Sequence, residues 1–342
     1  MSILKNKIVG VALVGLAASL MATPSMAQEK MRIALDTNPV HVRNKGVEVF
    51  VDELKKRTGD RFDITVYPSG QLFRDRDIPR ALRQGAVEMG VPGTWQLDSV
   101  EPTAALPTLP MFYGVDIPTV YKVLDGEIGD YLNEVFEKRM RVKIPGKWMA
   151  LGMQHTFGVS DEIDYDTYKG KKIRYPGGTG NAARISKLGG IPVLVPWPDV
   201  PLGMSQGVMD GLITTYESAS SSKLMDSGMK YAFDDENMFN QYVPMISDAF
   251  WKKQPKDVQD AILESWDIAV TWERENALKA QDKARENLIN QGLKVIVPSK
   301  EQITAARKEL MQIQPQLVEE MKIDPEVTNK IYEALKEAGV EY

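Results

Sequence analysis

The sequence predicts an α/β protein with two lobes, a ligand cleft between the lobes and a long helix bracing both. Strand-like and helix-like segments alternate in residues 31–91, and the same alternation recurs in residues 171–214. Such alternation is typical of parallel strands covered by helices. The residues between Pro255 and Gln291 contain neither glycine nor proline, which favours continuous helix. A cleft between two such units is a preferred location for a small-molecule site.

The first unit contains strand-like and helical runs in strict alternation. They lie, beginning with a strand, at residues 31–35, 42–56, 62–67, 78–85 and 87–91. The first helix is amphipathic, because Val47, Phe50 and Leu54 recur on one face. Ligands of a parallel sheet bind beyond the carboxyl ends of its strands. We therefore expect three loops at the cleft, namely residues 37–41, 68–72 and 92–96.

The second unit has the same order of elements. Strands are expected at residues 171–175, 191–195 and 210–214, and helices at 181–188 and 200–207. The later stretch at 255–291 carries Ile262, Trp266 and Val270 at helical spacing. At 1.5 Å per residue, a helix of ~35 residues would be about 50 Å long and could run across both lobes. Two helices with an unmarked break are the alternative. Residues 299–338 indicate further helices, and the first has a capping-type start at Ser299.

Residues 1–27 have the layout of a secretory signal peptide. Lys5 and Lys7 precede an apolar run at 8–20, and Ser25-Met-Ala27 forms a small-x-small site just before Gln28. An uncleaved membrane anchor is the alternative, because the apolar run is only slightly shorter than the roughly 18 apolar residues that a membrane span needs. Pro24 and the cleavage-like site favour removal after Ala27. We expect an exported protein.

The composition excludes several classes of protein. There is no cysteine, and His41 and His155 are the only histidines, so a His/Cys zinc site is excluded. The net charge of −5, without a basic stripe, argues against a nucleic-acid partner. No P-loop or H-E-x-x-H pattern occurs. Counting residues leaves a Ser-His-Asp triad open. We expect no enzyme, no cofactor and no metal.

Arg174 is the residue that points most directly to a ligand. It ends the run Tyr168-Lys-Gly-Lys-Lys-Ile-Arg174 and precedes Tyr175 and Pro176. Its planar guanidinium can hold a carboxylate through two hydrogen bonds. A solvated surface charge is the alternative, because exposure is the usual state of arginine.

Several motifs, taken together in this order and spacing, resemble one family. They are Tyr67-Pro-Ser-Gly-Gln-Leu72, residues 106–112 with Leu109-Pro110, Lys169-Gly-Lys-Lys-Ile-Arg174, Leu188-Gly-Gly-Ile-Pro192, Gln206-Gly-Val-Met-Asp-Gly211 and Trp251. The chain resembles, over nearly all of its mature length, the extracytoplasmic solute-binding proteins of tripartite ATP-independent periplasmic (TRAP) transporters, of the dicarboxylate-binding (DctP) type.

The resemblance implies a periplasmic-binding-protein-like fold that encloses its ligand when the lobes close. It implies location in the periplasm and delivery of the solute to a small and a large membrane permease subunit. On this basis residues 28–151 plus 239–277 would form lobe I, and residues 152–238 plus 278–342 would form lobe II. The family's usual anchor is an arginine at the place of Arg174, which would pair with the carboxylate of the solute.

The resemblance also implies further ligand contacts in the second lobe. Many members have Gly-x-Arg where this chain has Gly152-Met-Gln154. Gln154 cannot neutralise a second carboxylate, which favours a monocarboxylate. Trp197 stands where an aromatic residue commonly packs on the solute, with core packing as the alternative. Thr214 occupies a ligand-contacting position, and Glu217 would balance Arg174, meet a cationic group of the solute or form a surface salt bridge.

First-lobe loops would supply the remaining contacts, from Asn38, His41, Gln71, Thr94, Trp95 and Tyr113. His41 would donate to the ligand or cap the following helix, and the aromatic residues would wall the cleft or simply pack. The resulting hypothesis is a binding protein for a hydroxy or keto monocarboxylate, with an aromatic body as one option. A binding protein of an ABC importer or chemoreceptor system and, more remotely, a secreted hydrolase are the alternatives.

Overall fold

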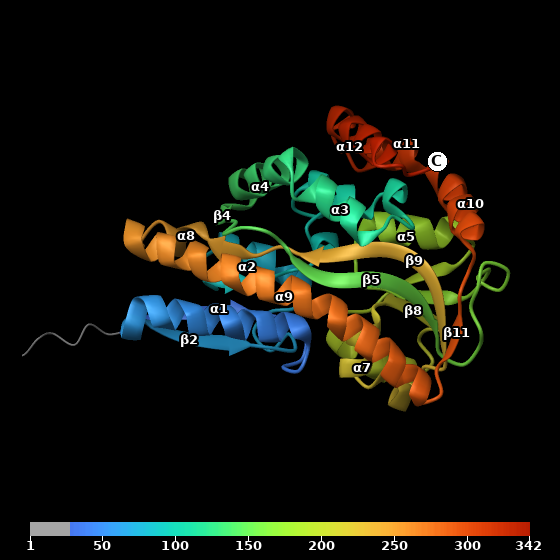
Figure 1. Ribbon diagram of the computed structural model, residues 1–342, viewed down its shortest axis with the longest axis horizontal. Coiled ribbons are helices and arrows are strands. Elements are labelled where there is room, and N and C mark those ends of the chain that lie inside the picture. The colour runs from blue at the N-terminus through green and yellow to red at the C-terminus, as the bar shows by residue number, and fades with distance from the viewer. Residues whose placement is uncertain (1–27) are drawn as a thin grey trace, which may run out of the picture.

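The computed structural model describes residues 28–342, coloured along the chain in Figure 1. The predicted signal peptide at 1–27 and its cleavage after Ala27 lie outside the described residues. Within the described part of the chain, no helix combines the length and apolar character needed to cross a membrane.

The first lobe is built on a five-stranded sheet with the order β2-β1-β3-β10-β4. The strands are β1 (Glu29–Ala34), β2 (Phe62–Tyr67), β3 (Met89–Gly90), β4 (Val142–Lys143) and β10 (Met245–Ser247). β1 pairs in parallel with β2 and β3, as the alternating pattern predicts, whereas β10 is antiparallel to both of its neighbours. The accompanying helices are α1 (Val42–Thr58), α2 (Ile78–Arg83) and α8 (Asp248–Trp251).

The second lobe is built on a six-stranded sheet with the order β11-β9-β5-β8-β6-β7. The strands are β5 (Met149–Gly158), β6 (Lys172–Tyr175), β7 (Ile191–Leu194), β8 (Gly211–Thr214), β9 (Tyr231–Tyr242) and β11 (Lys294–Ile296). The predicted parallel core is present, because β6 pairs in parallel with β7 and β8. The accompanying helices are α5 (Thr179–Lys187), α6 (Val200–Ser205) and α7 (Tyr216–Ser221).

The long antiparallel strands β5 and β9 run through the middle of the molecule (Figure 1). Their pairing extends from Met149 opposite Tyr242 to Gly158 opposite Tyr231. The register shifts twice, between Ala150 and Gly152 and between Gln154 and Thr156. These strands connect the two lobes and contribute side chains to the space between them.

A single helix, α9 (Lys256–Asn290), spans 35 residues and lies along both lobes (Figure 1). Ile262 and Trp266 pack in the core beside α1, whereas Ala284 and Leu288 pack in the core of the second lobe. The alternative of two helices is therefore wrong. The absence of helix breakers from this stretch explains its continuity.

The other helices cover the upper side of the molecule in Figure 1. The α-helices are α3 (Ile117–Leu124), α4 (Glu127–Met140), α10 (Lys300–Met311), α11 (Gln314–Glu320) and α12 (Pro325–Glu337). Short 3-10 helices are η1 (Gly59–Arg61), η2 (Asp75–Asp77), η3 (Thr94–Gln96), η4 (Pro102–Thr108), η5 (Pro110–Phe112), η6 (Trp197–Asp199) and η7 (Leu224–Ser227). The capping box predicted at the start of α10 is present between Ser299 and Gln302.

The C-terminal helices depart from the predicted division into lobes. The family resemblance places residues 278–342 in lobe II, but Leu317 of α11 and Ile331 of α12 belong to the same core as Leu106 and Phe136. Their apolar faces cover first-lobe helices, which sequence periodicity cannot reveal. The remaining boundaries of the two lobes stay a prediction.

We expect Gly152→Ala to destabilise the fold at the crossing between the lobes. Gly152 has a φ of +120°, and an added Cβ would lie 2.6 Å from Nε2 of Gln281 on α9. Strain and the displaced glutamine together should lower the free energy of unfolding by about 2 kcal/mol. Urea denaturation measures this. Gly170→Ala is the control, because Gly170 has a φ of +77° with no atom within 4 Å of the added Cβ. Equal losses for the two variants would contradict the role of Gln281.

Candidate functional site

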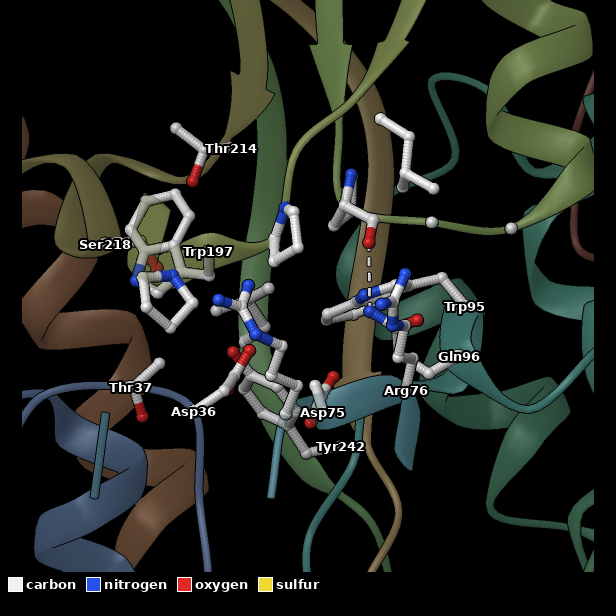
Figure 2. A pocket seen from close by; sticks show the side chains of 18 of the residues that line it. Asp36, Thr37, Asp75, Arg76, Trp95, Gln96, Trp197, Thr214, Ser218 and Tyr242 are labelled. Carbon is white, nitrogen blue, oxygen red and sulfur yellow. Dashed lines mark hydrogen bonds between the residues drawn. The ribbon is translucent and has the colours of Figure 1, made fainter. Parts of the chain in front are cut away.

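A cavity of about 200 Å³ lies between the two lobes. Figure 2 shows Thr214 and Trp197 on one side of it and Thr37, Asp36 and Asp75 on the other. Of the three loops expected at the cleft, two contribute side chains, through Thr37 and through Trp95 with Gln96. No residue of the loop at 68–72 lines the cavity, which is lined instead by the residues just after it, 74–76.

Arg174 lines the cavity from β6 and is only 1% exposed. Strand pairing places it beside Val193 of β7 and Leu212 of β8, so the side chain leaves the middle of the second sheet. Its Nε donates to the carbonyl of Val195 at 2.8 Å, and Nη1 donates to the carbonyl of Ile213 at 3.3 Å. Nη2 is buried and has no hydrogen-bond partner among the described residues.

No acidic side chain within residues 28–342 forms an ion pair with Arg174, although the charge of Asp36 acts on it from a distance. Burial lowers the pKa of its guanidinium to about 9, which still leaves the group protonated at neutral pH. The guanidinium carbon lies 5.3 Å from the centroid of the Trp197 ring, a cation–π contact. Asp36 also lines the cavity, but it forms a buried ion pair with Arg43. A buried cation in this state is suited to binding an anion.

Four other predicted site residues join Arg174 at the cavity: Gln154, Trp197, Thr214 and Trp95. Gln154 and Thr214 are buried, and the Oε1 atom of Gln154 has no hydrogen-bond partner within the described structure. Trp197 is half-buried. Trp95 is 3% exposed and packs against Tyr242 with a centroid distance of 5.5 Å, so it is both packed and part of the cavity wall.

Asn38, His41 and Glu217 do not line the cavity but connect the two lobes beside it. Nε2 of His41 lies 2.7 Å from Oε2 of Glu217. Nδ1 of His41 accepts a hydrogen bond from the backbone N–H of Arg43 at 3.1 Å, so His41 caps α1. Asn38 donates to the carbonyl of Ser221 at 3.1 Å. Glu217 is therefore in a buried interlobe contact, and the expectation of a surface salt bridge does not fit its 7% exposure.

The remaining predicted residues lie away from the cavity. Gln71 is exposed in a turn, and Thr94 is buried next to Trp95 without reaching the cavity. The expectation that Tyr113 faces the cleft does not hold. It follows η5 into a separate core, where its hydroxyl lies 3.1 Å from that of Tyr165 and its carbonyl accepts a hydrogen bond from Arg307.

Sequence reasoning missed Asp75 as part of the cavity. This carboxyl group is 5% exposed, and its Oδ2 accepts from the backbone N–H of Gly93 at 3.2 Å, whereas Oδ1 has no partner among the described residues. Burial, reinforced by the nearby Asp36, raises the pKa of Asp75 well above its ordinary value. Its position four residues after Gln71 in the Pro-Ser-Gly-Gln-Leu motif was an available signal. Tyr242 and Ser218 also line the cavity, and no local pattern marks them.

Within residues 28–342 there is no group of three or more histidine, aspartate or glutamate side chains arranged to hold a metal ion. The cavity is thus characterised by a buried cation, neutral hydrogen-bonding groups, an unpartnered carboxyl oxygen and aromatic rings.

The comparisons with known proteins agree with this architecture. Residues 34–321 match the model of the family described as DctP, bacterial extracellular solute-binding protein, family 7. The chain is 26% identical over 288 residues to the C4-dicarboxylate-binding periplasmic protein DctP of Rhodobacter capsulatus. The aligned residues cover 81% of this chain and 84% of that protein.

Two solved structures have closely similar folds. The sugar acid binding protein DctPAm of Advenella mimigardefordensis, in complex with galactonate, has a TM-score of 0.85 at 18% identity. The match covers 91% of this chain and 99% of that protein. A TRAP periplasmic solute binding protein of Ralstonia eutropha, with bound (S)-2-acetolactate, has a TM-score of 0.84 at 21% identity. The match covers 91% of this chain and 100% of that protein. The chain belongs to bacterial extracellular solute-binding protein family 7, the DctP-type solute-binding proteins of TRAP transporters, whose members bind solutes for transport and are not enzymes.

Proposed function

We propose that this protein captures a small organic monocarboxylate in the periplasm and delivers it to the membrane subunits of a TRAP transporter. The observation that carries the proposal is Arg174, a fully buried guanidinium with a free Nη2 and no acidic partner among the described residues. An unpaired buried charge is costly, and a solute carboxylate would supply the missing counter-ion.

The cavity favours a single carboxylate with further oxygen functions. The other cations that line it are engaged or exposed, since Arg74 pairs with Asp199 and Arg76 lies at the surface. Gln154 and Thr214 offer neutral hydrogen-bonding groups. A hydroxyl group on the solute could satisfy the free oxygen of Gln154 or of Asp75, because it both donates and accepts. This combination fits a hydroxy or keto acid better than a dicarboxylate.

The size of the cavity and the ligands of similar proteins support the same class. About 200 Å³ is less than the roughly 300–1,000 Å³ typical of pockets for drug-sized ligands. Galactonate and (S)-2-acetolactate, bound by the two similar structures, are hydroxylated monocarboxylates, whereas the Rhodobacter capsulatus protein is named for C4-dicarboxylates. The predicted signal peptide supports export. Hinged closure of the lobes would enclose the acid, and a small and a large permease subunit would receive it.

Thermal unfolding in the presence of a panel of organic acids tests the proposal. A ligand that binds only the folded protein raises its melting temperature. We expect hydroxy and keto monocarboxylates to stabilise the protein and to show micromolar or tighter affinity by calorimetry. Stabilisation by dicarboxylates alone would contradict the monocarboxylate assignment, and no response to any organic acid would contradict the function.

We expect Trp197→Ala to weaken binding of the acid about tenfold. The ring supports the Arg174 guanidinium and forms part of the cavity wall. A cation–π contact contributes about 0.5–2 kcal/mol, and the lost apolar wall adds to this. Calorimetry with the preferred acid measures the change. Trp251→Ala is the control, because Trp251 packs against the first-lobe core outside the cavity. The same affinity for wild type and Trp197→Ala would show that the ring serves packing alone.

A further inference from the structure

The buried contact between Glu217 and the start of α1 crosses from one lobe to the other. Oε2 of Glu217 lies 2.7 Å from Nε2 of His41, and Oε1 accepts a hydrogen bond from the backbone N–H of Val42 at 3.3 Å. His41 is 0% exposed and Glu217 is 7% exposed. A carboxylate at the first N–H groups of a 17-residue helix is also favoured by the helix dipole. Charge-assisted contacts of this kind are stronger when water is excluded from them.

Two further contacts reinforce this crossing. Nε2 of His41 lies 3.0 Å from the hydroxyl of Ser218, the residue after Glu217. Asn38 donates to the carbonyl of Ser221 at 3.1 Å and to the hydroxyl of Ser222 at 3.3 Å. The turn before α1 in the first lobe is thus joined to α7 in the second through side chains on both sides. We refer to Asn38, His41 and Glu217 as the interlobe latch.

The side chain of Glu217 contributes these contacts only while the lobes are together. Every hydrogen bond or ion pair that its carboxylate forms within the described chain goes to α1 or to His41 in the opposite lobe. Its backbone N–H, in contrast, donates to Oε1 of Gln281 at 2.8 Å. Nε2 of the same glutamine donates to the carbonyl of Leu151 at 2.7 Å, at the crossing strand. Gln281 therefore holds α7 in place relative to the hinge, and the carboxylate is directed across the cleft.

We propose that Glu217, with His41 and Asn38, sets the balance between the open and closed forms and so determines the affinity for every solute without contacting any of them. The effect on affinity rests on the proposed function, whereas the effect on lobe closure does not. A protein whose binding-competent form is only partly populated binds with an affinity reduced by that fraction. Weakening the latch should therefore reduce the affinity for all ligands by the same factor.

The proposal predicts a specific pattern of binding for Glu217→Ala. We expect the affinity for each of two chemically different organic acids to fall by the same factor, about 10- to 100-fold, because a buried hydrogen bond to a charged group is lost. The loss should lie in faster dissociation. Asp199→Asn is the matched control. It removes the interlobe ion pair with Arg74, whose partners are 42% and 45% exposed, and such exposed pairs contribute little.

A second measurement needs no solute. The chain has no cysteine, so Asp52→Cys on α1 and Gln206→Cys after α6, both at exposed positions, allow specific spin labelling in the two lobes. We expect Glu217→Ala to shift the label–label distance distribution of the ligand-free protein towards longer distances, and Asp199→Asn to leave it unchanged. Glu217→Gln, which keeps the shape of the side chain, should shift it less than alanine does.

The outcomes separate the latch from the proposed function. Unequal losses for the two acids would show that Glu217 contacts the solute, and an unchanged distance distribution would show that it does not control closure. Either result overturns the proposal. If wild-type protein binds no organic acid, the proposed function fails, and the distance distributions still decide whether the latch exists.

Discussion

Replacing Arg174 with alanine should abolish tight binding of the organic acid. In the bound protein the carboxylate would be enclosed in the cavity with the guanidinium as its counter-ion. Without Arg174 the carboxylate is left buried and unpaired, which costs about 3–5 kcal/mol. This corresponds to a loss of affinity of roughly a hundred- to several thousand-fold. Calorimetric titration with the acid that best stabilises the wild-type protein measures it.

The same substitution should leave the ligand-free fold intact. Arg174 makes two hydrogen bonds to carbonyl groups but has no acidic partner among the described residues, and burial lowers its pKa to about 9. Removing a buried cation in this state relieves a desolvation cost, so the free energy of unfolding should stay within about 1 kcal/mol of wild type. Arg174→Met, which preserves more of the volume, should behave in the same way.

Arg184→Met is the matched control for this experiment. Arg184 is also 1% exposed, and burial lowers its pKa to about 10, but it does not line the cavity. It donates to the carbonyl of Asn237 and to the side chain of Asn181. Its loss should leave the affinity for the acid near the wild-type value. If Arg174→Met retains wild-type affinity, the assignment of the anchor is wrong.

The elements of the two parallel units followed from the sequence because they depend on local patterns. The alternation at 62–67 predicted β2, and the apolar face of 42–56 predicted α1. The sequence did not predict β4 and β10, because they are only two and three residues long. Such strands are too short for an alternating pattern of apolar and polar residues to be visible. The packing of α11 and α12 on the first lobe depends on which apolar faces meet, and no single segment contains that information.

The site shows the same division between local and long-range information. Arg174, Trp197 and Thr214 lie in the second unit's loops and strands, where motif spacing points to the cleft. The sequence of the loop allows His41 to contact the ligand or to cap the following helix, and the structure shows the cap. Its second contact, to Glu217, joins segments far apart in the sequence, and nothing in either segment indicates the other. Asp75 lines the cavity because η2 follows the motif loop, a geometry that composition does not reveal.

Glu273 should make the folded protein lose stability as the pH rises. It lies on α9 with 0% exposure, directly under Gly46 of α1, where an added Cβ would be 2.8 Å from its side chain. Oε2 accepts a hydrogen bond from the backbone N–H of Ala150 at 2.9 Å, and Oε1 has no partner within residues 28–342. Burial raises the pKa of Glu273 from 4.5 to about 8, despite the opposing effects of the Ala150 hydrogen bond and of nearby arginines.

The direction of the pH effect follows from this shift. Below pH 4.5 the carboxyl group is protonated in both the folded and the unfolded chain, and it has no effect on the pH dependence. Between pH 4.5 and about 8 the unfolded chain loses the proton while the folded protein retains it, so stability falls as the pH rises. Above this window both forms are ionised, and the loss is constant. The free energy of unfolding should fall by about 3 kcal/mol between pH 5 and 8.

Glu273→Gln should remove this dependence, because glutamine keeps an acceptor for the N–H of Ala150 and does not titrate. Urea denaturation at several pH values should give a stability difference, variant minus wild type, that grows steadily between pH 5 and 8. Taking the difference cancels other buried groups that titrate in this range, such as Asp235, whose pKa burial raises to about 6. Glu275→Gln, at an exposed position on the same helix, should show no such trend. A difference that does not change with pH would mean that Glu273 ionises as readily in the folded protein as in the unfolded chain, through water or a rearrangement of α9 against α1.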